Sequence, residues 1–142
     1  MRRWKSTVLG AMVSCGLFVS LATPASANSA WVVVKNLDGS TGGIGAATGG
    51  APYDYWFDVS ADLPATGSAN MCAVTQLAYN GSGTPENPWV NSVTDCSRGN
   101  GAVWGSDHAQ FNAYIRVCLR SAALPVITRC GDAAVLADDG TV

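Results

Sequence analysis

The sequence predicts an all-β protein, a small antiparallel β-sandwich or barrel-like fold of about 7–9 short strands. Three observations lead to this fold class. Residues 111–120 alternate without a break between apolar and polar side chains, the two-residue period of a strand with one face on a core. No segment has a convincing helical period. Short strand-like runs are separated by clusters of Gly, Pro and Asn, which are typical turn residues.

The individual strands follow from the same patterns. Alternating, β-branched or aromatic runs predict strands at 30–36, 53–60, 71–79, 89–96, a short strand beginning at 102–104, and strands at 111–120, 126–130 and 133–137. The Gly- and Ala-rich stretch 42–50 is interpreted as a flexible strand or loop. Its Gly43-Ile44-Gly45 triplet lacks the strand-then-helix context of a dinucleotide-binding loop.

The chain begins with a pattern typical of a secretory signal peptide. A basic start precedes an apolar run over residues 8–22, which is short for a membrane span, and the small-residue cleavage motif Ala25-Ser26-Ala27. We therefore expect residues 1–27 to be removed and residues 28–142 to form one secreted, extracellular domain that is no longer attached to a membrane. The alternative is an uncleaved anchor.

The domain expected after cleavage is acidic. Residues 1–27 carry three of the eight basic residues and none of the ten acidic ones, so five basic side chains remain and the net charge is near −5. Nucleic acids and anionic membrane surfaces attract proteins of the opposite charge. We therefore expect neither as a partner.

Four cysteines remain in the domain, an even number that predicts disulfides in a short exported chain. They are Cys72, Cys96, Cys118 and Cys130. No two of them have the C-x-x-C spacing typical of zinc ligands, so no metal is expected.

The turn positions predict how these cysteines pair. Directly opposed residues of an antiparallel hairpin lie symmetrically about its turn. Cys72 and Cys96 are symmetric about residue 84, inside a dense cluster of turn residues at 80–88. Cys118 and Cys130 are symmetric about residue 124, inside the break at 121–125. The sequence therefore predicts the disulfides Cys72–Cys96 and Cys118–Cys130.

No catalytic set is recognised, so we expect a protein that is not an enzyme and needs no cofactor. His108, the only histidine, follows Ser106 and Asp107, which are residue types of a hydrolase triad. Neighbours in sequence point in different directions and cannot form that relay, so His108 is interpreted as a loop residue.

The aspartates give no clear catalytic pair. Asp54 and Asp58 would stand about 13 Å apart along one strand, too far for the two carboxylates of a glycosidase. A pairing of Asp58 with Asp62 or Asp95 stays open, although exposure to solvent is the usual state of such residues.

Tryptophans next to polar residues suggest a binding surface instead. On the strand 53–60, Trp56 falls on the face opposite the apolar one, together with two aspartates. Sugar rings stack their C–H faces on aromatic side chains and bond their hydroxyls to carboxylates. The candidate ligand-binding residues are Asp54, Trp56, Asp58, Trp89 and Trp104. The alternative is that these tryptophans fill a second core face of the sandwich.

The leading hypothesis is a secreted binding domain for an extracellular ligand, a glycan or a cell-surface protein. A protease inhibitor or other protein-interaction module is the alternative, with 81–88 as the candidate reactive loop.

The chain is acidic and strand-rich, has two predicted disulfides and begins with an actinobacterial type of signal. In size and composition alone it is similar to exported apoproteins that bind enediyne chromophores and to small secreted protease inhibitors. That resemblance implies a third hypothesis, a small-molecule-binding apoprotein. The outer face of the 111–120 strand is a second candidate surface, formed by Tyr114, Arg116 and Arg120.

Overall fold

The described part of the chain forms nine antiparallel strands arranged in two sheets. The computed structural model describes residues 29–49, 56–78, 88–108 and 113–137. The strands are β1 (Ser29–Lys35), β2 (Thr41–Gly49), β3 (Trp56–Asp62), β4 (Met71–Ala78), β5 (Val90–Asp95), β6 (Val103–His108), β7 (Ala113–Ser121), β8 (Ile127–Cys130) and β9 (Ala134–Ala137). No helix occurs in these ranges. The predicted all-β class is confirmed.

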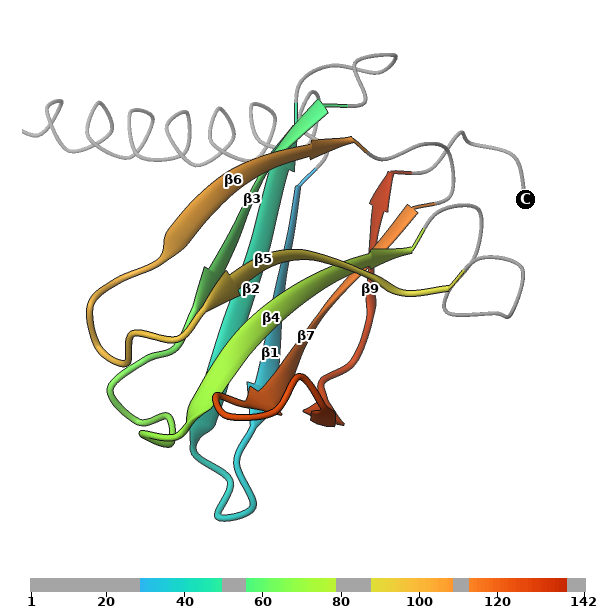
Figure 1. The fold of residues 1–142 in the computed structure, drawn as a ribbon. Coiled ribbons are helices and arrows are strands. Elements are labelled where there is room, and N and C mark those ends of the chain that lie inside the picture. Colours follow the sequence, from blue (N-terminus) through green and yellow to red (C-terminus); the bar gives the residue numbers. More distant parts are fainter. Residues whose placement is uncertain (1–28, 50–55, 79–87, 109–112, 138–142) are drawn as a thin grey trace, which may run out of the picture.

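The two sheets form separate layers (Figure 1). The first has the order β1-β2-β3-β6, and the second has the order β5-β4-β7-β8, with β9 also paired to β7. Strand β8 pairs with residues 118–120 of β7, and β9 pairs with residues 113–115. Closure into a barrel is not found among the described strands, so the sandwich describes the fold and the barrel-like alternative does not.

The core lies between the sheets, as the alternation predicted. In β7 the side chains of Ala113, Ile115, Val117 and Leu119 are all buried. The facing residues of β3 include Phe57 and Val59 in the same apolar cluster. Residues 111 and 112, where the predicted strand began, lie outside the described residues.

The glycine-rich stretch is a nine-residue strand, β2, between β1 and β3. Of the two alternatives for this stretch, a flexible strand or a loop, the strand is therefore confirmed and the loop is wrong. A Cβ atom on Gly45 would lie 2.7 Å from Oγ1 of Thr75 and 3.1 Å from Cβ of Val117, both on the opposite sheet. The Thr75 hydroxyl itself donates a hydrogen bond of 2.7 Å to the Ser60 carbonyl, which ties the two sheets together. Glycine is required here because the two sheets approach closely. Gly43 and Gly45 of the Gly43-Ile44-Gly45 triplet therefore allow the sheets to pack together.

Replacing Gly45 with valine is expected to lower the free energy of unfolding by about 1–3 kcal/mol, because the new side chain overpacks a well-filled core. Urea denaturation of Gly45→Val measures the change. Ala46→Val is the matched control, since Ala46 is the next residue on the opposite face of β2 and is only partly buried. Equal stability of the two variants would contradict the close-packing explanation.

Both predicted disulfides are present. Cys118 is directly opposed to Cys130 across β7 and β8, and the Ala73–Asp95 pair of β4 and β5 has the register that brings Cys72 opposite Cys96. The bridged Cα atoms are 4.2 Å apart for Cys72–Cys96 and 4.0 Å apart for Cys118–Cys130.

The bridges lie on the outer face of the second sheet. Val74 lies next to both bridges. It is paired with Cys118 of β7, and it lies two residues after Cys72 on the same face of β4. Cys72, Val74 and Cys118 have no solvent-exposed surface. The two disulfides thus belong to a buried apolar strip on this face of the sheet.

Candidate functional site

Three tryptophans stand on the outer face of the first sheet. Trp31 on β1, Trp56 on β3 and Trp104 on β6 are 66%, 62% and 60% exposed. Trp31 and Trp56 come from strands whose alternate residues, such as Val32 and Phe57, point into the core, and Trp104 shares their face because it is paired with Ser60 of β3. Because successive side chains of a strand point to opposite faces, the burial of Val32 and Phe57 holds Trp31 and Trp56 outward.

Trp31 and Trp104 belong to one row that crosses all four strands. Trp31 is opposed to Ala46, Ala46 to Ser60, and Ser60 to Trp104. Three interstrand spacings place the backbones of the two tryptophans about 14 Å apart. Only the small side chains of Ala46 and Ser60 stand between the two indoles.

A polar row lies next to this aromatic row. Thr48 on β2 is opposed to Asp58 on β3, and Asp58 to Ser106 on β6. All three residues are exposed. Their side chains offer a carboxylate and two hydroxyls, which together accept and donate hydrogen bonds.

The third row holds an aromatic pair. Trp56 is opposed to His108, and their rings meet edge to face with centroids 5.3 Å apart. His108 is the last residue of β6, so its interpretation as a loop residue is wrong. The strand is longer than its sequence suggested because β3 provides hydrogen-bonding partners for Gly105 and Ser106, which have little intrinsic strand preference.

We name the outward residues of these three rows the tryptophan face. They are Trp31, Ala46, Ser60 and Trp104; Thr48, Asp58 and Ser106; and Trp56 and His108. The tryptophan face combines flat apolar surfaces with polar groups placed between them.

The structure brings together three of the five predicted ligand-binding residues, Trp56, Asp58 and Trp104. Their exposure shows that the core-filling alternative is wrong for Trp56 and Trp104. Trp89 lies elsewhere, since its ring is stacked under the guanidinium of Arg116 on β7, with 4.3 Å from Cζ to the ring centroid. Asp54 lies outside the described residues.

Trp31 was not among the ligand-binding residues predicted from the sequence. It shares a strand face with Val33, and Val32 and Val34 form an equally apolar opposite face, so the alternation alone did not show which face is outward. The polar Lys35 at the next position on the Trp31 face was the available signal.

The second candidate surface is partly used by the fold itself. Tyr114, Arg116 and Arg120 are half-buried. The Arg116 Nε donates a hydrogen bond of 2.8 Å to Gln76 Oε1, and the Gln76 amide donates one of 2.8 Å to Asn91 Oδ1. Burial lowers the pKa of Arg116. This arginine ties β4, β5 and β7 together and leaves less of its charge for a partner.

Asp58 and Asp95 do not form a carboxylate pair. Asp58 is exposed on the tryptophan face, whereas Asp95 is 1% exposed at the end of β5. The Asp95 carboxylate accepts hydrogen bonds from the Leu63 amide at 2.7 Å and from the amide and hydroxyl of Ser97 at 2.8 Å each. Asp95 therefore holds the chain after β3 against the end of β5, which is a structural role.

Metal ligands do not gather in the part of the chain that the structure describes, where no group of three His, Cys, Asp or Glu side chains is placed to hold an ion. Residues 1–27, the 81–87 part of the candidate reactive loop and residues 138–142 lie outside that part. Within it, no helix is long and apolar enough to cross a membrane.

Comparison with known proteins adds no relative. No family model, no curated protein and no solved structure matches the chain.

Proposed function

We propose that the protein is an exported, non-enzymatic domain that binds a glycan on the tryptophan face. The observation that carries this proposal is the row from Trp31 to Trp104, with two exposed indoles on either side of small side chains. Exposed apolar surfaces, such as the one formed by these tryptophans, often mark the place where a protein binds its partner or ligand. The two disulfides are compatible with an extracellular protein.

The composition of the tryptophan face favours a sugar over a purely apolar ligand. The polar row of Thr48, Asp58 and Ser106 lies between the Trp104 row and the Trp56–His108 pair. A glycan chain presents alternating C–H faces and hydroxyl groups, so it matches aromatic surfaces that flank hydrogen-bonding groups. An apolar ligand would leave the Asp58 carboxylate desolvated without a partner.

Binding is expected to be measurable with cello-, xylo- and chito-oligosaccharides, followed by tryptophan fluorescence and by calorimetry. Trp31→Ala and Trp104→Ala are each expected to weaken binding about tenfold, since loss of one stacking surface removes about 1.4 kcal/mol. The physical reason is that each indole supplies one of the two aromatic surfaces of the row.

Trp89→Ala is the matched control, because it also removes one indole but acts on the other sheet. It is expected to leave the affinity unchanged. No saturable binding to any member of the panel, or equal losses in all three variants, would argue against the tryptophan face as a glycan site.

A further inference from the structure

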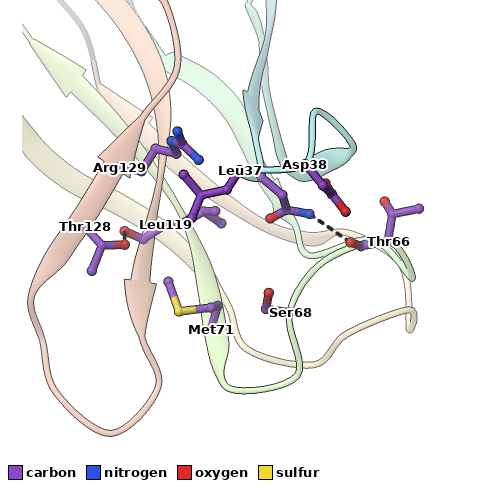
Figure 2. Close-up of a pocket in the computed structure, with 9 residues that line it drawn as sticks. Leu37, Asp38, Thr66, Ser68, Met71, Leu119, Thr128 and Arg129 are labelled. Carbon is purple, nitrogen blue, oxygen red and sulfur yellow. Dashed lines mark hydrogen bonds between the residues drawn. The ribbon is translucent and has the colours of Figure 1, made fainter.

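A cavity of about 580 Å³ opens at one end of the sandwich, apart from the tryptophan face. Its walls are the β1–β2 turn, the loop that precedes β4, and the β7–β8 hairpin, as Figure 2 shows. Sites for small molecules in proteins have volumes of roughly 300–1,000 Å³. The cavity is therefore large enough for a small organic ligand.

One part of the cavity is apolar. Leu119, which is 5% exposed, belongs to the core, and Met71 at the start of β4 packs against that core. Leu37, at the tip of the β1–β2 turn, is 92% exposed. A ligand lying on Leu119 and Met71 would also cover Leu37, the most exposed of the large apolar side chains that the structure describes.

Arg129 supplies a positive charge to this cavity. It is opposed to Leu119 across β7 and β8, so its side chain lies on the face of the hairpin that carries Leu119. Figure 2 shows the Arg129 side chain beside Leu119 and Leu37. An arginine at the rim of an apolar cavity suits a carboxylate or sulfonate, because its planar guanidinium forms paired hydrogen bonds with such groups.

Asp38 stands on the other side of Leu37 in Figure 2. Its Oδ1 accepts a hydrogen bond of 2.9 Å from the Ser40 amide and another from the Ser40 hydroxyl, and these bonds lower the pKa of Asp38. The carboxylate is therefore charged at neutral pH. Both of these bonds use Oδ1, so Oδ2 can accept a hydrogen bond from a hydroxyl or amine group of a ligand.

Hydrogen bonds hold the walls of the cavity in place. The Asn36 amide donates hydrogen bonds of 2.9 Å to the Thr66 carbonyl and to the Ser40 hydroxyl. The Thr66 hydroxyl donates one of 2.7 Å to the Thr41 carbonyl, and the Thr128 hydroxyl donates one of 3.2 Å to the Leu119 carbonyl. A preformed cavity needs little reordering on binding, which favours affinity.

We propose that this cavity binds a small amphipathic organic anion. Its apolar body lies on Leu119, Met71 and Leu37, its acid group pairs with Arg129, and a hydrogen-bond donor at the far end faces Asp38. This site and its ligand class are independent of the proposed glycan site, so either can fail without the other.

The test uses two fluorescent naphthalene probes of similar shape, 8-anilinonaphthalene-1-sulfonate and the uncharged N-phenyl-1-naphthylamine. The native protein is expected to bind the sulfonate saturably at one site and to melt at a higher temperature in its presence. Arg129→Gln is expected to weaken binding of the sulfonate about tenfold or more, since it removes a charge-assisted pair. The same variant should leave binding of the uncharged probe unchanged.

Arg120→Gln is the matched control, because it removes the same charge from the other face of the same hairpin. It is expected to bind the sulfonate as the original protein does. The proposal is overturned if the native protein binds no sulfonate saturably, if both arginine variants lose affinity equally, or if Trp104→Ala removes the binding instead.

Discussion

Gly131→Ala is expected to lower the free energy of unfolding by about 3 kcal/mol, a large effect for the addition of one methyl group. A Cβ atom at this position would overlap the carbonyl oxygen of Val33 and lie 3.1 Å from Cα of Val34. Both are backbone atoms of β1 and cannot turn away as a flexible side chain would. Urea denaturation followed by circular dichroism measures the loss.

The loss has a local cause that the structure makes clear. Gly131 connects β8 to β9, and its amide donates a hydrogen bond of 2.9 Å to the Val117 carbonyl. A methyl group would push this connection away from β1, and both the hydrogen bond and the pairing of β9 with β7 would weaken. The exposed neighbour Asp132 provides the control, since Asp132→Ala is expected to unfold at the same urea concentration as the original protein. A Gly131→Ala variant of unchanged stability would show that the connection does not need to lie against β1.

Loss of the disulfides is expected to have the largest effect on stability. The bridges close loops of 24 and 12 residues in sequence separation, and the chain-entropy model assigns roughly 3 kcal/mol to each. Together they amount to about 6 kcal/mol, comparable with the whole net stability of a domain of this size. We expect the reduced protein to be largely unfolded at 37 °C, as measured by the near-ultraviolet circular dichroism of its tryptophans.

Single-bridge variants separate the two contributions. The double variant Cys118→Ala/Cys130→Ala is expected to stay folded but to lose about 3 kcal/mol, and β8, only four residues long, should exchange its amide hydrogens faster. A variant with all four cysteines replaced serves as the control for reductant, since dithiothreitol should not change its unfolding midpoint. If reduction left the unfolding midpoint of the original protein unchanged, the bridges would have no role in stability.

The strands and the cysteine pairing could be predicted because both depend on short-range signals. The alternation along 111–120 shows where a strand lies, and the turn residues at 80–88 and 121–125 show where it reverses. Cysteines that are symmetric about such a turn come together in a simple hairpin, and the registers of β4 with β5 and of β7 with β8 confirm this. Strand β2 was harder to predict, because Gly and Ala have a low strand preference. Small residues are needed there because side chains of the other sheet lie close to β2.

The candidate site was predicted only in part. Trp56 and Asp58 share a face of a single strand, so local alternation was enough to place them together. That Trp89 lies apart from them could not be predicted, because its partner Arg116 lies on β7, far away in sequence. The cavity with Arg129 was missed altogether, since its walls come from three connections whose proximity no local pattern encodes.

The sequence by itself determined that a strand covers residues 113–120 with Ile115 and Val117 in the core, and that this strand is bridged to its neighbour through Cys118 and Cys130. Only the tertiary structure decided that β6 lies beside β3 and that Trp31 and Trp104 therefore share one row. The physical reason is the range of the signals. Alternation and turns act between neighbours in sequence, whereas the order of strands in a sheet depends on packing between segments that are distant in the chain.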